Sequence, residues 1–224
     1  MFQRINPRWQ QNSVCAVAAS GPSLTADVAR LGVPIVAVND AWRVLPTADV
    51  LYAADAKWWE YHKGCMGFPG ERWSTHSLPN NNKLETAERY GLNLVRGTEG
   101  EGFSDNPARL HYGSNSGFQG INLALHLMGW AGRILLFGFD MRGGHFFGDH
   151  PLELRSEEMP GQDDRKFRLW FREFDRAAKL LPKTVEVINC TPNTALPSFP
   201  KMELKHTNDI GARLQGAAFG LCRR

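Results

Sequence analysis

Arg133-Ile134-Leu135-Leu136-Phe137-Gly138-Phe139-Asp140 is the stretch that decides the fold. It is a continuous apolar run of strand length that ends in Gly-Phe-Asp and opens into a glycine-rich loop, residues 141–151. Apolar runs without polar alternation are typical of strands buried on both faces, as in a parallel sheet covered by helices. The preceding segment, 116–128, is apolar nearly all round and predicts a buried helix packed on that sheet.

Three shorter apolar runs near the start of the chain have the same form. They cover 13–19, 34–40 and 48–55, and each ends in polar residues after a short intervening segment. This pattern fits βαβ units that feed a parallel sheet. The sequence therefore predicts an α/β fold, with a Rossmann-like, mostly parallel sheet flanked by helices in a single domain, residues 1–200.

The rest of the chain is less regular. Short strands are expected at 72–76 and 92–96 within a loop-rich stretch, which predicts a lid-like insertion at about 60–112. Residues 163–181 form the clearest amphipathic helix, and 185–189 a last strand. The tail 201–224 has little periodicity, so its order is left open.

Composition limits the classes of function. The chain has 224 residues, of which 42% are hydrophobic and 22% charged, and a net charge of +3. A small charge without a basic cluster makes nucleic acid an unlikely partner. We expect no membrane span, since no apolar run approaches the roughly 20 residues that one needs. The start lacks a signal-peptide core, and the four cysteines are scattered without metal-ligand spacing, so a cytoplasmic location is expected. The oligomeric state stays open.

Polar residues at the expected strand ends are the first candidates for a ligand site. Ser20, Gly21, Pro22 and Ser23 follow the first strand and precede a short helix, where glycine and free N–H groups favour a phosphate. The alternative for this segment is a plain strand-to-helix turn. Further polar residues at strand ends are Asn39, Asp40 and Asp55. They would reach the same sheet edge and hold a ribose, base or metal, or would be solvated turn residues.

The second group of candidates surrounds the deciding strand. Ser116 and Gly117 begin the buried helix, where Ser116 could simply be its cap. Asp140 ends the strand, and His145 and His150 lie in the loop beyond it. Two histidines beside a strand-end carboxylate favour a general base, although a single histidine is more often structural. No metal site is predicted, because the sequence supplies no convincing third and fourth zinc ligand.

Several of these short motifs together carry a family resemblance. Gly-Pro-Ser-Leu at 21–24, Val38-Asn39, Ser116-Gly117 and Gly138-Phe139-Asp140 resemble, in this order, motifs of the family 42 bacterial sialyltransferases. That family has a Rossmann-like domain with a lid and transfers sialic acid from a CMP donor, without a metal, through a histidine base. The first motif is also similar to MptE-like proteins, which are pterin pyrophosphokinases that use ATP and magnesium. The segments Val-Asn-Asp at 38–40, Asp-Ala-Lys-Trp-Trp at 55–59 and Gly-Asp-His-Pro at 148–151 further resemble uncharacterised phage-encoded proteins, which implies the host cytoplasm.

The resemblance implies a role for each matching residue. Gly21, Pro22 and Ser23 would approach the donor phosphate, and Asn39 the nucleotide. Ser116 and Gly117 would contact the cytidine or the donor, and Asp140 the ribose or base. The family pattern differs at Ser20, where it has Asn, and its histidine lies further downstream, so His145 or His150 would have to replace it.

Three functions follow as expectations. The first is a glycosyltransferase-like transferase that takes a nucleotide-sugar donor, such as a CMP-linked sugar, and uses His145 or His150 as its base. The second is a pyrophosphokinase in which Asp40, Asp55 or Asp140 binds Mg²⁺, an ion that prefers oxygen ligands. The third is a nucleotide-binding module without catalytic activity.

Overall fold

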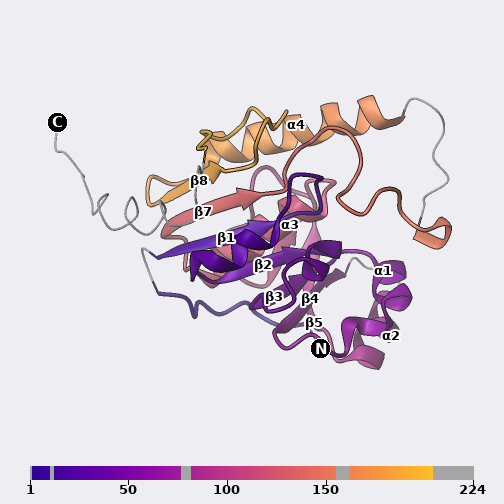
Figure 1. Cartoon of the computed structure of the whole chain (residues 1–224). Helices are drawn as coiled ribbons and strands as arrows, with labels where there is room; N and C mark the ends of the chain where they lie inside the picture. The colour runs from indigo at the N-terminus through magenta and orange to yellow at the C-terminus, as the bar shows by residue number, and fades with distance from the viewer. Residues whose placement is uncertain (1, 11–12, 77–81, 155–161, 204–224) are drawn as a thin grey trace, which may run out of the picture.

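One sheet of eight parallel strands forms the centre of the protein (Figure 1). The computed structural model describes residues 2–10, 13–76, 82–154 and 162–203. The strands are β1 Val14–Ala18, β2 Ile35–Val38, β3 Val50–Tyr52, β4 Glu71–His76, β5 Asn93–Thr98, β6 Arg109–His111, β7 Gly132–Phe137 and β8 Val185–Asn189. Their order across the sheet is β6-β5-β4-β3-β2-β1-β7-β8. This confirms the α/β, Rossmann-like arrangement expected from the apolar runs.

The strand order reverses next to β1. From β1 the chain adds β2 to β6 on one side, and it then returns to place β7 and β8 on the other. In open α/β sheets the connections diverge at such a point, and ligands bind in the crevice outside the carboxyl ends of the two strands. The ends of β1 and β7 therefore mark the position in this fold at which a site is expected.

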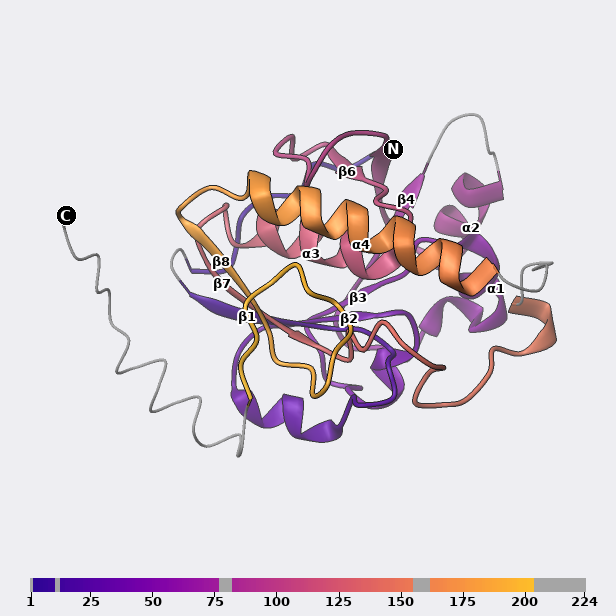
Figure 2. The same ribbon diagram turned by 90° about the horizontal axis from the view of Figure 1, so that it is seen from above.

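Helices cover the sheet on both faces (Figure 2). The α-helices are α1 Ala56–Tyr61, α2 Asn82–Tyr90, α3 Ser116–Leu127 and α4 Gln162–Leu180, and the 3-10 helices are η1 Ala26–Leu31, η2 Asn39–Arg43, η3 Lys63–Cys65 and η4 Leu152–Leu154. One core lies under α3 and α4, and the other contains residues of η1, η2, α1 and α2. Gly120 lets α3 approach the sheet closely, because a Cβ there would overlap Val38.

Most elements lie where the sequence placed them, but the stretch about 60–112 does not form an insertion apart from the sheet. It supplies β4, β5 and β6, and it contains the helix α2, which the pattern did not predict. The reason is the polarity of these elements. Thr75 and His76 in β4 are buried although they are polar, and α2 has a polar sequence in which Leu84, Ala87 and Tyr90 pack against the core.

Two further expectations can be compared with the described residues. Among them, no helix is long and apolar enough to cross a membrane. Cys15, Cys65 and Cys190 are buried free thiols. Cys222 and most of the tail expected at 201–224 lie outside the described residues.

Candidate functional site

The turn after β1 and the tip of β7 are in direct contact at the point where the strand order reverses. The hydroxyl of Ser23 donates to Asp140 Oδ2 over 2.9 Å, and the Gly21 N–H donates to the Gly138 carbonyl over 3.0 Å. A Cβ at Gly21 would overlap both the Asp140 carboxylate and the Gly138 carbonyl. Glycine is therefore required at position 21 for the close approach of the two strand ends.

This contact uses the backbone N–H groups of the turn that an anion would otherwise bind. The N–H groups of Gly21 and Leu24 are used by the carbonyls of Gly138 and Gly21, and Pro22 has none. The Ser23 N–H points at Asp140 Oδ2 over 3.5 Å. The carboxylate of Asp140 thus occupies the place beside Ser23 where the sequence suggested a donor phosphate. The following helix, η1, is a 3-10 helix of six residues and offers little dipole to an anion.

Asp140 is buried, and its backbone is fixed by hydrogen bonds from the segment after β8. Its side chain is buried, with 7% of the residue exposed. The segment after β8 fixes its backbone, since the Ala195 N–H donates to the Asp140 carbonyl over 2.8 Å and Thr194 donates to the Phe139 carbonyl over 2.6 Å. In the described part of the chain, the two hydrogen bonds to the Asp140 side chain both go to Oδ2. None of the hydrogen bonds from the described residues goes to Oδ1.

The start of α3 forms a second wall beside this contact. Its N-cap is Asn115, whose side chain accepts from the Phe118 N–H over 3.1 Å. The expectation that Ser116 caps the helix was wrong, because Asn115 holds that position and Ser116 is the first helical residue. Gly117 lies against the Phe139 ring, which puts the helix start next to the tip of β7. The N–H groups of Ser116 and Gly117 have no intrahelical partners and can meet an anion.

Asn39 and Asp40 follow β2, but only one of them is near a surface. Asn39 is half-buried in a left-handed conformation, with φ of 50°. Asp40 is only 3% exposed. Its Oδ2 accepts from the Trp58 indole over 2.9 Å, and its Oδ1 lies 3.4 Å from His62 Nε2 and 3.6 Å from Arg43. The carboxylate of Asp40 is therefore used inside the protein and is not offered to a nucleotide.

Asp55 lies further along the same edge, at the N-cap of α1. Its side chain makes no capping hydrogen bond, and the residue is exposed. Its charge acts on Lys83, whose pKa is lowered by burial and raised in part by Asp55. The Lys83 ammonium donates to the Ala54 carbonyl over 2.8 Å. Asp55 thus lies at the carboxyl end of β3 with a cationic neighbour, away from the contact between Ser23 and Asp140.

Residues 141–151, called the histidine loop below, return over the turn after β1. The Phe146 N–H donates to the Ser20 carbonyl over 3.1 Å, and the Ser20 hydroxyl donates to the Val38 carbonyl over 3.2 Å. The rings of His145 and His150 have centroids 4.5 Å apart. The loop brings both predicted histidines to the carboxyl edge of the sheet, beside the turn at residue 20.

The environment of His145 favours its neutral form. Burial lowers its pKa, the nearby His150 lowers it further, and the Ser20 carbonyl, Asp40 and Asp149 raise it in part. A neutral imidazole can accept a proton, which is what a general base at neutral pH requires.

Sequence reasoning missed the residues that surround the Asp40 carboxylate. These are Arg43, Trp58 and His62, which come from η2, α1 and the residue after α1. For these contacts the sequence offered one indication, the spacing of three residues between Asp40 and Arg43, which suits an ion pair within one helical turn. His62 is 22 positions from Asp40 in the chain, so the fold alone brings them together.

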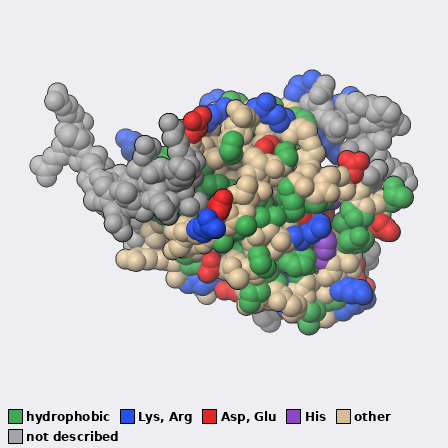
Figure 3. Space-filling view, viewed as in Figure 1, with side chains coloured by type: hydrophobic (Ala, Val, Ile, Leu, Met, Phe, Trp, Pro, Cys, Tyr) green, Lys and Arg blue, Asp and Glu red, His purple; other side chains and the backbone are tan. Residues whose placement is uncertain are grey.

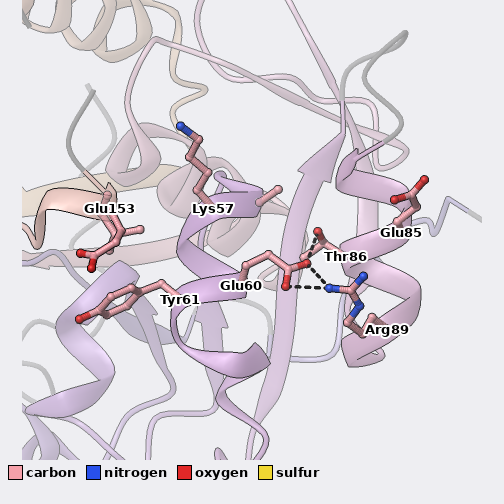
Figure 4. Close-up of a pocket in the computed structure, with 9 residues that line it drawn as sticks. Lys57, Glu60, Tyr61, Glu85, Thr86, Arg89 and Glu153 are labelled. Carbon is pink, nitrogen blue, oxygen red and sulfur yellow. Dashed lines mark hydrogen bonds and ion pairs between the residues drawn. The ribbon is translucent and has the colours of Figure 1, made fainter. Parts of the chain in front are cut away.

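A separate hollow of about 610 Å³ lies between α1, α2 and η4 (Figure 4). Glu60 closes one side, since its carboxylate accepts from Thr86 over 2.8 Å and from Arg89 over 2.9 Å. None of the residues predicted for the site lines this hollow. It is therefore a second position at which a ligand could be sought.

Charge and metal ligands add two observations. On the face shown in Figure 3, the described acidic and basic side chains are interspersed, without the broad cationic surface that suits nucleic acid. Within residues 2–10, 13–76, 82–154 and 162–203, no group of three or more His, Cys, Asp or Glu side chains is placed to bind a metal ion.

The comparisons with known proteins found no similarity. No family model, no curated protein and no solved structure matches this chain.

Proposed function

We propose that the protein is a transferase that binds a nucleotide-activated donor in the crevice where β1 and β7 diverge. One observation supports this most. The turn at Gly21, the tip of β7 at Asp140 and the start of α3 meet at the reversal of strand order, and the histidine loop lies beside them. Ligands of open α/β sheets bind at this position.

Each wall of the crevice suits a different part of the donor. Asp140, with its free Oδ1 and its bond to Ser23, suits the hydroxyls of a ribose. The N–H groups of Ser116 and Gly117 suit the phosphate, in place of the turn at 21–23. Asn39 lies at the end of β2, where it can contact the nucleoside. The Ser20 hydroxyl and the Gly21 N–H hold the strand ends together, through the carbonyls of Val38 and Gly138.

The histidine loop supplies the base in this proposal. Transfer of a sugar to an acceptor hydroxyl needs a positioned donor and a base within hydrogen-bond reach of that hydroxyl. His145 and His150 are the candidates because they reach the carboxyl edge, and the neutral form of His145 is favoured. A CMP-linked sugar is the first donor to test, because the motifs at 21–24, 38–39, 116–117 and 138–140 resemble those of family 42 sialyltransferases.

The experiment is a thermal-shift screen of CMP, UDP, GDP and ATP compounds, with and without Mg²⁺. A nucleotide at 100 times its Kd stabilises the fold by about 2.7 kcal/mol. For a chain of this size, we expect Tm to rise by about 5–11 °C. Asp140→Asn and Ser23→Ala should lose most of this rise. Asp175→Asn is the matched control, because Asp175 pairs with Lys179 on the surface of α4.

Two outcomes would contradict the proposal. If no nucleotide shifts Tm, the crevice is not a nucleotide site. If a nucleotide binds equally well to Asp140→Asn, it binds elsewhere. A chelator separates the metal-dependent alternative, because pyrophosphoryl transfer would need Mg²⁺ and the proposed reaction would not. Binding without turnover of any donor would remove the catalytic half of the proposal.

A further inference from the structure

Asp40 anchors a set of side chains that reach from η2 and α1 to the histidine loop. Its Oδ1 faces both Arg43, 3.6 Å away, and His62, 3.4 Å away. Its Oδ2 is fixed by the indole N–H of Trp58. Because the carboxylate is nearly fully buried, it has little water around it and attracts the Arg43 guanidinium more strongly than it would in water.

Arg43 in turn reaches the loop. The Arg43 guanidinium lies over the Phe147 ring, 5.6 Å from its centroid, which is within the range of a cation–π interaction. His62 lies beside Asp40, and His150 lowers its pKa, as two imidazoles that repel each other when protonated do. Arg43 is therefore the side chain that connects the buried carboxylate to the loop.

The rings of His145, Phe147 and His150 pack on one another. A contact that restrains one of them therefore restrains all three. The His145 and Phe147 rings are stacked with centroids 4.9 Å apart. His150 lies 4.5 Å from His145 and 5.3 Å from Phe147. Gly143 and Gly148 have positive φ, and their surroundings are open. The loop is further joined to the rest of the protein by Met141 and Phe146, which pack against the two cores, and by the Phe146–Ser20 hydrogen bond.

We propose that Asp40 and Arg43 are positioning residues that hold the histidine loop closed against the turn at Ser20, and we call this pair the clasp. The purpose of this closure rests on the proposed function: it keeps His145 and His150 at the crevice. The geometry of the clasp does not depend on that function and can be tested without a ligand.

Protonation of the imidazoles around the loop would add positive charge beside Arg43. Arg43, His62, His145 and His150 all face the same region, and protonation of any imidazole there adds repulsion. The carboxylates on the other side are the buried Asp40 and the exposed Asp149. Asp40 is also near the Cys65 thiol of η3, whose pKa is raised by burial and by Asp40. Asp40 is thus the buried charge that opposes this repulsion.

The first readout is hydrogen exchange of the Phe146 amide, which reports closure through its bond to the Ser20 carbonyl. We expect Asp40→Asn and Arg43→Gln to raise its exchange rate by about tenfold or more. The Ala19 amide, bonded to the Phe137 carbonyl between β1 and β7, should keep its rate. Asp27→Asn is the matched control, since Asp27 pairs with Arg30 at the same three-residue spacing on η1.

The second readout is the titration of the imidazoles by NMR, which separates positioning from simple packing. Burial lowers the pKa of His62 most, while Asp40 raises it and Arg43 lowers it. Asp40→Asn should therefore lower the pKa of His62, and Arg43→Gln should raise it. A loop that is only loosened would move the pKa upwards in both variants, because the ring would gain water.

The outcomes decide clearly. If Phe146 exchanges at the wild-type rate in both variants, the clasp does not exist. If Asp40→Asn fails to fold, Arg43→Gln still decides, because the Arg43 side chain is 50% exposed and tolerates substitution. A clasp that is confirmed while no nucleotide binds would leave this inference standing and would reject the proposed function.

Discussion

Gly21→Ala tests the contact on which the site depends. The new Cβ would overlap Asp140 Oδ2 and the Gly138 carbonyl, and it would lie 2.9 Å from Asp140 Cγ. The carbonyl cannot move away easily, because it accepts from the Gly21 N–H, and Gly138 is held at a φ of 67°. The ends of β1 and β7 must therefore separate.

The magnitude follows from two contributions. Overpacking in a well-packed region costs about 1–3 kcal/mol. Loss of the hydrogen bond from Ser23 to the Asp140 carboxylate, 2.9 Å long, adds about 1.5–3 kcal/mol where it breaks completely. Because the carboxylate can yield in part, we expect a total of about 2–4 kcal/mol. Each kcal/mol lowers Tm by about 2–4 °C in a chain of this size, so Tm should fall by about 4–16 °C.

The assay is urea denaturation together with a thermal melt, with Gly67→Ala as the matched control. Gly67 is exposed, and a Cβ there would meet nothing within 4 Å. That variant should be neutral or up to about 1 kcal/mol more stable. The double variant Gly21→Ala with Asp140→Ala should show coupling of about 1–2 kcal/mol, since both changes act on one contact. A Gly21→Ala protein as stable as Gly67→Ala would refute the contact between the strand ends.

Three further predictions concern stability, pH and thiol reactivity. Tyr52→Phe should cost about 1–2 kcal/mol in urea, because the buried hydroxyl donates to Gln119 over 2.5 Å and lies 3.0 Å from Thr75; the same change at the exposed Tyr61 should cost nothing. Burial lowers the pKa of His126 from 6.5 to about 4, so the unfolded chain takes up this proton first, and the free energy of unfolding should fall by up to about 3 kcal/mol between pH 6.5 and pH 4. In urea titrations across this range, His126→Gln should show a smaller fall, and an equal fall would contradict this. Burial raises the pKa of three thiols, so in a Cys222→Ser variant a thiol reagent should label them only after unfolding; fast labelling of the folded protein would contradict the burial of Cys15, Cys65 and Cys190.

Most strands were predictable from the sequence, including those at 72–76, 92–96 and 185–189, whereas β6 and α2 were not. β1, β2, β7 and α3 were predictable because most of their residues are buried and apolar, although α3 also buries Gln119, Asn122 and His126. The strands and helix between residues 71 and 111 were harder to predict, since they bury polar groups. Thr75, for example, is buried beside Tyr52 and Gln119, and its hydroxyl donates to the Gln119 side chain over 2.9 Å. Such hydrogen bonds make polar residues compatible with a core, and a hydrophobic pattern cannot reveal them.

The candidate site was predictable in place and less so in detail. Polar residues at the ends of parallel strands must share one edge of the sheet, so Gly21, Asn39 and Asp140 could be grouped from sequence. Whether a side chain faces the crevice or the interior depends on tertiary contacts. Asp40 points into the interior, where it accepts a hydrogen bond from Trp58 and lies beside His62. Both residues follow β3, the strand after β2 in the chain.

The central claim is that a nucleotide-activated donor binds between the turn at Gly21, the tip of β7 and the start of α3. The most direct measurement is a titration of the ¹⁵N-labelled protein with CMP, or with the nucleotide that stabilises it most, followed by amide chemical shifts. The account predicts that the largest changes fall on residues 20–23, 116–117 and 138–140. Changes confined to the hollow between α1, α2 and η4, around Glu60 and Arg89, would contradict it, and so would no change with any nucleotide.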